Sequence, residues 1–170
     1  DLRFQLTGDL TQFPFHKSPG AFRLEGKLVD ATLETFAPGW PGATAIQGNL
    51  VLDRQRLTIR ADKARYQNVP LRAVKVEIPD LMDAGNQVLT VDGKASGATT
   101  DFLHYVNASP LEKIAGSFTR ELRATGNGNL DLHIEVPLHD ALHTRVKGDY
   151  RFAGNTLRLI PALPEFSEAT

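Results

Sequence analysis

The chain has 170 residues, with 19 Lys and Arg against 20 Asp and Glu, so its net charge at pH 7 is −1. A basic surface of the kind that binds nucleic acid is therefore not expected. Cysteine is absent, which excludes disulfides, thiolate metal ligands and thiol nucleophiles. Hydrophobic residues make up 41% of the chain, which is enough to bury a core, and the longest uncharged stretch, 35–52, is interrupted by two prolines and does not resemble a membrane span.

Alternation of apolar and polar residues dominates the chain and predicts half-buried β-strands. The first run is 2–7, where every even position is apolar and every odd position is polar. The pattern returns at 22–28, 46–52, 57–61, 74–78, 89–91, 130–136, 146–152 and 157–159. About ten strands fit, and no crossover helices separate most of them, which predicts an antiparallel meander.

Turn residues and a weak internal similarity support consecutive hairpins. Asp53–Gln55 and Ala153–Asn155 are typical of tight turns between alternating runs. The segments 48–59 and 148–159 share the order Gly, polar residue, apolar residue, with the same spacing to a second apolar run. Repeated hairpins predict a sheet that further units can extend. Because the chain also begins inside an alternating pattern, we expect residues 1–170 to be a single segment of a longer protein.

One segment, at about 99–116, predicts one or two short helices. Thr99 or Thr100 can cap the first helix, and the run Ser109, Pro110, Leu111, Glu112 places a cap, a first-turn proline and an acidic residue at the start of the second. These helices have mixed apolar faces that must lie on something apolar, for which the sheet is the nearest candidate. They form either a lid that closes a hydrophobic core or a movable gate over a lipid path.

Residue types that carry catalysis do not converge in the sequence. His139 and His143 have the spacing of helical metal ligands, but Pro137 lies just upstream and the region is typical of a turn. No serine lies in a nucleophile motif, and the acidic loop 80–86 lacks the ligand order of a calcium site. We therefore expect no enzyme activity, no metal and no cofactor. A basic run at 54–65 is either a solvated strand face or a contact for phosphate headgroups.

A flat sheet of about ten strands with one apolar face would expose more hydrophobic surface than a soluble monomer tolerates. The sequence offers only short helices to cover it. The predicted fold is therefore mainly β, a long curved antiparallel meander sheet that forms a taco-like groove, with one or two short helices. The groove either packs against a second layer or holds a greasy ligand.

Several short motifs along the chain resemble one protein family. They are Phe13-Pro14-Phe15, Pro19-Gly20-Ala21-Phe22, Gly39-Trp40-Pro41, residues 76–81, Asp101-Phe102-Leu103 and Ser109-Pro110-Leu111. Together they resemble the central region of the YhdP-like family, which are AsmA-like, TamB-related bridge-like lipid-transfer proteins of Gram-negative bacteria. The resemblance implies a periplasmic part of an inner-membrane-anchored protein, with a curved β-groove that passes phospholipid toward the outer membrane. It also implies neighbouring β-groove segments of the same chain and contact with both membranes through parts outside these residues.

The resulting hypothesis is a structural segment of a phospholipid conduit whose partners are acyl chains. The candidate groove residues are Leu50, Leu52, Leu57, Ile59, Val74, Val76, Leu130, Leu132, Ile134 and Tyr150. The alternative is a scaffold or interaction module of envelope assembly with a closed apolar core, whose sheet edges pair with neighbours.

Overall fold

A computed structural model describes residues 1–15, 17–35, 39–115, 118–158 and 166–169. Two positions of the predicted pattern, Gly116 at the end of the second helix and Leu159 in the last strand, lie outside these residues. None of the helices in the described part is long and apolar enough to cross a membrane.

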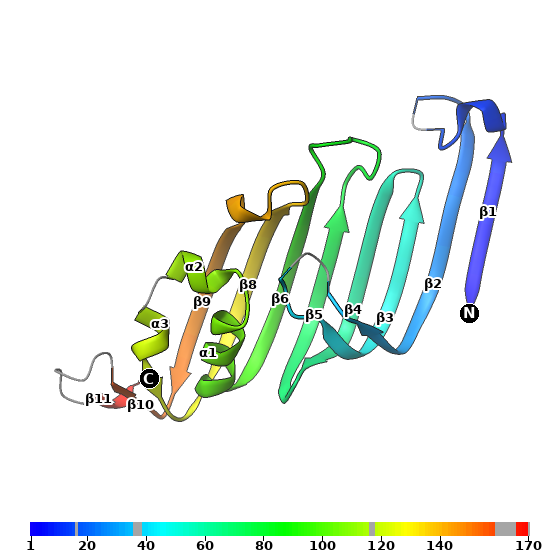
Figure 1. Ribbon diagram of the computed structural model, residues 1–170. Helices are drawn as coiled ribbons and strands as arrows, with labels where there is room; N and C mark the ends of the chain where they lie inside the picture. Colours follow the sequence, from blue (N-terminus) through cyan, green and yellow to red (C-terminus); the bar gives the residue numbers. More distant parts are fainter. Residues whose placement is uncertain (16, 36–38, 116–117, 159–165, 170) are drawn as a thin grey trace.

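One curved antiparallel sheet forms most of the molecule (Figure 1). Its eight strands follow the order of the sequence, β1-β2-β3-β4-β5-β6-β8-β9, and each strand pairs with the next. Their bounds are β1 Leu2–Gly8, β2 Gly20–Leu33, β3 Ala43–Asp53, β4 Arg56–Tyr66, β5 Val69–Ile78, β6 Val88–Ala98, β8 Asn127–Pro137 and β9 Arg145–Ala153. The sheet is an open meander, so the predicted fold class is confirmed.

The helical segment lies between β6 and β8 and covers the C-terminal end of the sheet (Figure 1). The described residues form three short α-helices, α1 Thr99–Asn107, α2 Leu111–Ala115 and α3 Phe118–Glu121. Two single-turn 3-10 helices lie elsewhere, at Leu10–Gln12 and Ala141–His143. Neither threonine caps α1, because the cap residue is Ala98 and the hydroxyl of Thr99 is buried in other contacts. Ser109 does cap the start of α2, since its Oγ accepts from the backbone N–H of Leu111 at 3.3 Å.

The last predicted hairpin does not form. The strand that follows β9, β10 (Asn155–Arg158), leaves the main sheet and pairs with β7 (Arg123–Ala124) and β11 (Phe166–Ala169) in a small second sheet. The chain turns away at Gly154, whose φ of 64° is in the left-handed region that glycine tolerates. Asn155, which is fully buried, then holds the new direction through its side-chain hydrogen bonds. It accepts from the N–H of Ala153 at 2.8 Å and donates to Thr99 Oγ1 at 2.5 Å and to the Thr125 carbonyl at 2.6 Å.

Irregular pairing in the middle of β2 to β5 gives the sheet its bend. The register shifts between Leu28 and Ala31 in β2, between Thr44 and Gln47 in β3, and between Arg72 and Lys75 in β5. Asp30, Ala45 and Ala73 have positive φ values of 54°, 51° and 49° at these places. Such bulges bend a strand and increase its twist. They also move the inward-facing side chains from even to odd positions, or the reverse, within a single strand.

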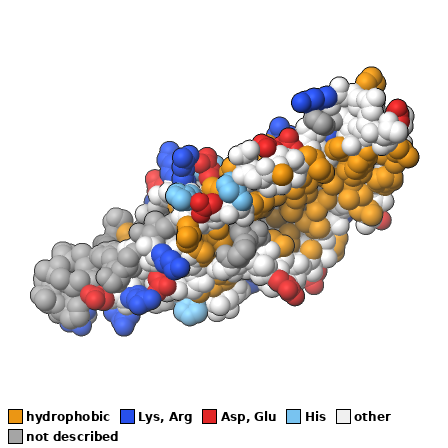
Figure 2. All heavy atoms as spheres, turned by 45° about the horizontal axis from the view of Figure 1, so that its top comes forward, with side chains coloured by type: hydrophobic (Ala, Val, Ile, Leu, Met, Phe, Trp, Pro, Cys, Tyr) orange, Lys and Arg blue, Asp and Glu red, His pale blue; other side chains and the backbone are white. Residues whose placement is uncertain are grey.

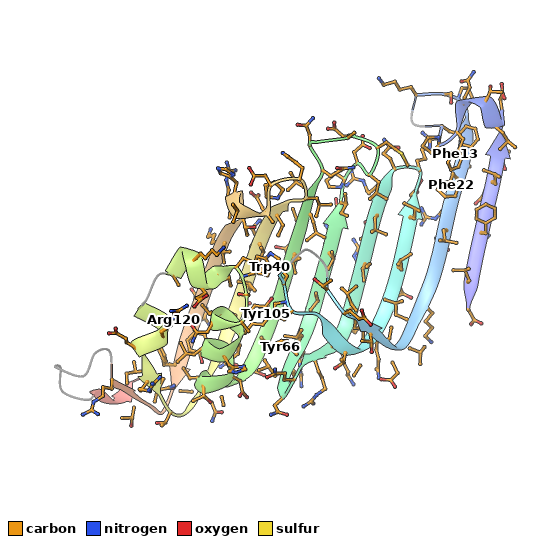
Figure 3. All side chains as sticks on the ribbon, viewed as in Figure 1. Phe13, Phe22, Trp40, Tyr66, Tyr105 and Arg120 are labelled. Carbon is orange, nitrogen blue, oxygen red and sulfur yellow. The ribbon has the colours of Figure 1, made fainter. Side chains whose placement is uncertain are left out.

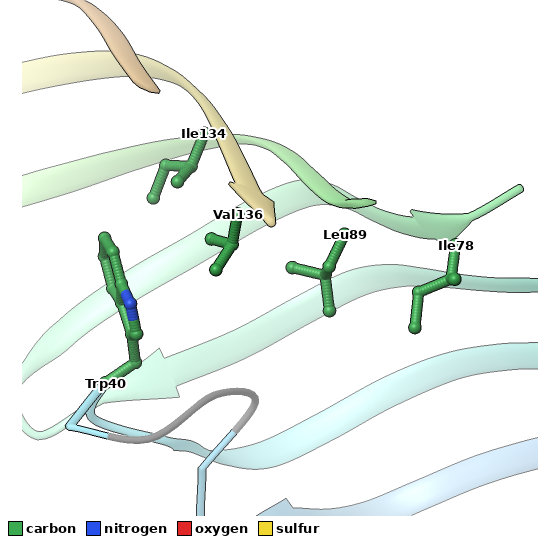
Figure 4. Packing of buried hydrophobic residues seen from close by; sticks show 5 residues of the cluster. All are labelled: Trp40, Ile78, Leu89, Ile134 and Val136. Atoms are coloured by element: carbon green, nitrogen blue, oxygen red, sulfur yellow. The ribbon is translucent and has the colours of Figure 1, made fainter. Parts of the chain in front are cut away.

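Two buried clusters lie on the concave side of the bend. The first contains Trp40, Ile78, Leu89, Ile134 and Val136 (Figure 4), and Tyr105 of α1 and Leu111 of α2 pack against it. The second contains Ile46, Ala61 and Ala64, and it lies where the bulges align. The buried hydrophobic side chains of both clusters therefore gather on one face of the sheet.

Candidate functional site

The concave face encloses an open apolar cavity of about 310 Å³. Strands β2 to β6, β8 and the inner side of α1 contribute its walls. Seven of the ten predicted groove residues line it: Leu50, Ile59, Val74, Val76, Leu130, Leu132 and Ile134. They meet because residues paired directly across antiparallel strands point to the same side, as in the row Leu50, Ile59, Val76, Val91 and Ile134.

Three predicted groove residues lie on the same face but outside the cavity. Leu52 and Leu57 are paired with each other beside the β3–β4 turn, and Leu57 packs against the Trp40 cluster. Tyr150 lies under α1, where its ring meets Phe102 at a centroid distance of 5.1 Å and its hydroxyl is 2.7 Å from Thr99 Oγ1. The helix therefore covers Tyr150, and this residue anchors α1 to the sheet.

Other cavity residues do not follow the alternation used to predict the groove. They lie beyond the bulges, where the inward-facing positions have changed parity, and they are Ala31, Leu33, Ala43, Ala64, Tyr66, Val69 and Leu71. The bulges are formed by non-glycine residues with positive φ, and the sequence gives no signal by which their positions could be predicted. The apolar character of these positions is visible in the sequence, but the face to which they belong is not.

The cover over the cavity is aromatic. Trp40, 2% exposed, comes from the β2–β3 connection and packs across the sheet onto Ile134 and Val136 (Figures 3 and 4). Tyr105 of α1 meets Tyr66 of β4 edge to face, with ring centroids 4.7 Å apart. Burial raises the pKa of both phenols, and the neighbouring Tyr66 raises that of Tyr105 further. The concave face is thus closed near the helices and open toward β1.

The open end continues as exposed hydrophobic surface. Phe22 of β2 stacks edge to face with Phe4 of β1, at a centroid distance of 5.9 Å. It also stacks edge to face with Phe13, at 4.8 Å, and Figure 3 labels both of these rings. The side chains of Leu2 and Phe4 are 73% and 59% exposed. Figure 2 shows the hydrophobic side chains as a hollowed band over this part of the sheet. A contiguous exposed patch of this kind is typical of a binding surface.

Charge is nearly absent from the cavity wall. Lys94 and Asp101 are its only charged members in the described part of the chain, and the Lys94 ammonium turns to the outer face to pair with Asp131 at 2.8 Å. Ion pairs cover that outer face. The Lys75 ammonium lies 2.5 Å from Glu77 and, with Arg56, holds the pKa of that carboxyl below its ordinary value. A hydrogen bond to Asp92, at 2.6 Å, raises the pKa of His133.

The polar residues that the sequence singled out have local roles. His143 belongs to a turn, where its Nδ1 lies 2.6 Å from the Asp140 carboxylate, and no cluster of possible metal ligands occurs among the described residues. In the basic run, Arg54 donates to the Gly20 carbonyl at 2.9 Å, Arg56 pairs with Glu77, and Arg65 donates to backbone carbonyls. Much of the charge in this run is therefore engaged within the chain.

Comparisons with known proteins agree with this geometry. The chain is 27% identical over 154 residues to the intermembrane phospholipid transporter YhdP of Escherichia coli (strain K12). That alignment covers 91% of this chain and 12% of the relative, so the chain corresponds to a small part of that protein. No solved structure matches the chain significantly. The model of the YhdP protein family matches residues 1–170, and the chain therefore belongs to the YhdP family, whose E. coli member transports phospholipid.

Proposed function

We propose that this chain is one segment of a hydrophobic conduit that carries phospholipid acyl chains across the periplasm between the inner and outer membranes. The observation that carries the proposal is the open, almost uncharged cavity on the concave face, continuous with the exposed hydrophobic surface toward β1. The phospholipid transporter among its relatives supports the choice of cargo. The ten groove residues predicted from the sequence remain the proposed lipid contacts. Seven of them line the cavity, and Leu52, Leu57 and Tyr150 lie on the same face at the edges of the groove.

The energetics favour such a surface. Exposing about 30 acyl methylenes to water costs about 0.8 kcal/mol each, or roughly 25 kcal/mol for a phospholipid. Contact with an apolar wall removes part of that area from water at every point of the path. The charged headgroup stays outside, because moving it into an uncharged cavity would cost its hydration. A cavity of about 310 Å³ suits part of one lipid, and the exposed surface toward β1 extends the contact.

The free edge of the sheet at β1 would allow the apolar face to be extended by further strands. Among the described residues, strand β1 pairs on one side only, with β2, and so leaves a row of backbone donors and acceptors on the other side. A further strand pairing there would continue the apolar face without a gap. We propose that neighbouring segments of the same protein occupy such positions, and that a membrane anchor outside these residues holds the protein in the inner membrane of a Gram-negative bacterium.

The test is lipid retention measured by native mass spectrometry after expression in bacteria. Leu50→Asp and Leu132→Asp each place a carboxylate in the half-buried cavity wall and should abolish co-purified phospholipid. Val29→Asp is the matched control, since Val29 is 69% exposed and does not line the cavity. Circular dichroism establishes that each variant is folded. Retention of lipid in both folded cavity variants would contradict the proposal.

A second measurement uses Trp40, the only tryptophan of the chain. It packs on Ile134, which lines the cavity, so its fluorescence reports on an acyl chain bound there. Phospholipid brominated on the acyl chain should quench it, and the same lipid should quench the Leu132→Asp variant much less. A protein that neither co-purifies with lipid nor responds to brominated lipid would instead be the scaffold with a closed core.

A further inference from the structure

A second cavity, of about 410 Å³, lies behind α1. Phe102 and Tyr105 face the apolar groove, whereas Leu103, His104 and Asn107 face this second cavity, so α1 separates the two. Its other walls come from α3, β7 and β10. None of the ten residues predicted to contact lipid lines it.

The polar lining of this cavity consists of hydrogen-bond donors and cations. Its described wall contains two arginines, one histidine, one asparagine and four threonines, and it contains no Asp or Glu: Thr100, His104, Asn107, Thr119, Arg123, Thr125, Thr156 and Arg158. Asn107 and Thr119 bond to each other at 2.9 Å and close the side between α1 and α3.

Two of the nearby carboxylates are engaged or placed elsewhere. Glu112 is engaged by Arg120, whose side chain lies on α3 (Figure 3), and Asp101 lines the groove on the other side of α1. Arg123 Nη1 donates to the Arg120 carbonyl at 3.2 Å, which fixes the guanidinium but uses one of its five N–H donors. Arg158 lines the wall as well, so two guanidinium groups face the cavity, and Arg123 is the one whose described contact is to a backbone carbonyl.

We propose that this cavity binds a phosphate ester, with Arg123 as the main contact to the phosphate. A guanidinium presents paired N–H groups that match two oxygens of one phosphate, and threonine hydroxyls and an imidazole can bind the others. Leu103, Leu122 and Ala124 supply an apolar patch for the carbon part of the ester. The volume is in the range of small-molecule sites. The phosphate belongs either to a lipid headgroup or to a soluble ester, and the two sources can be separated.

The experiment titrates the full 170-residue chain with two probes. Glycerol 3-phosphate is measured by isothermal titration calorimetry in a phosphate-free buffer, and vesicles of phosphatidylcholine, with and without phosphatidic acid, are measured by flotation. Arg123→Gln should weaken binding by about tenfold or more, because a charge-assisted pair is lost. Arg151→Gln is the matched control, because Arg151 lies on β9 beside Asp149 and its substitution removes the same charge away from the cavity.

Each outcome decides something. Binding of glycerol 3-phosphate that Arg123→Gln weakens and Arg151→Gln leaves unchanged supports a site for a soluble ester. The same selective loss with the phosphatidic acid vesicles alone supports a headgroup site. If Arg123→Gln disturbs the fold, Thr156→Glu, which adds a carboxylate to the wall, should abolish binding in its place. No binding of either probe, or equal weakening by both arginine variants, would overturn the assignment.

Discussion

Replacing Trp40 by alanine tests how the concave face is closed. The indole is 2% exposed and packs in one cluster with Ile78, Leu89, Ile134 and Val136. Truncating a buried tryptophan to alanine costs about 3–5 kcal/mol, because contacts are lost and a void remains. A domain of this size loses roughly 2–4 °C of Tm per kcal/mol, so we expect Tm to fall by roughly 6–20 °C. The expected loss of about 3–5 kcal/mol is a large part of the total stability of a domain, which is about 5–15 kcal/mol.

Urea denaturation followed by circular dichroism measures the free energy of unfolding directly. Leu142→Ala is the control, since Leu142 is 73% exposed and its truncation should change stability by no more than about 0.5 kcal/mol. Trp40→Phe keeps an aromatic ring in the cluster and should restore most of the loss. A fall of less than about 1 kcal/mol in Trp40→Ala would refute the conclusion that this side chain is a main part of the buried cluster on the concave face.

Three further substitutions test the bend, the second sheet and the charged face. Gly48→Ala should destabilise the protein by about 2 kcal/mol or more in urea denaturation, because the added Cβ would lie 2.0 Å from the Arg60 carbonyl oxygen. Gly97→Ala is the control and should be nearly neutral, since the nearest atom to its added Cβ would be 3.6 Å away. Equal effects of the two substitutions would contradict the close approach of β3 and β4. Asn155→Ala should lower the free energy of unfolding by about 2–4 kcal/mol in the same measurement, because it leaves the buried groups that Asn155 contacts without a hydrogen-bond partner. It should also speed amide hydrogen exchange in β10 before the other strands. An equal increase of exchange in all strands would argue against a local role of Asn155. The hydrogen bond to Asp92 raises the pKa of His133 in the folded protein, so the pairing stabilises the fold fully below the unfolded pKa of about 6.5, and this stabilisation is lost as pH rises through the folded pKa. Asp92→Asn should therefore lower Tm at pH 5.5 and leave it unchanged at pH 9. An equal fall of Tm at both pH values would contradict the pairing.

The candidate site was partly predictable because a strand places alternate side chains on one face. Leu50, Ile59 and Val76 follow that rule in three consecutive strands, and they line the cavity. Tyr150 follows the same rule in β9, yet α1 lies over it. A period of two identifies a face of the sheet, but it does not tell which part of that face another element covers.

Local patterns in the sequence determined the strands, their antiparallel order and the apolar character of one face, because these depend on side-chain alternation and on short turns between neighbours. Tertiary structure decided the rest. Similar turn sequences at Asp53 and at Ala153 lead to a hairpin in one case and to a departing strand in the other, since only Asn155 meets Thr99 and Thr125 across the fold. The bulges in β2 to β5 likewise arise from pairing between whole strands, and the curvature that forms the groove depends on them.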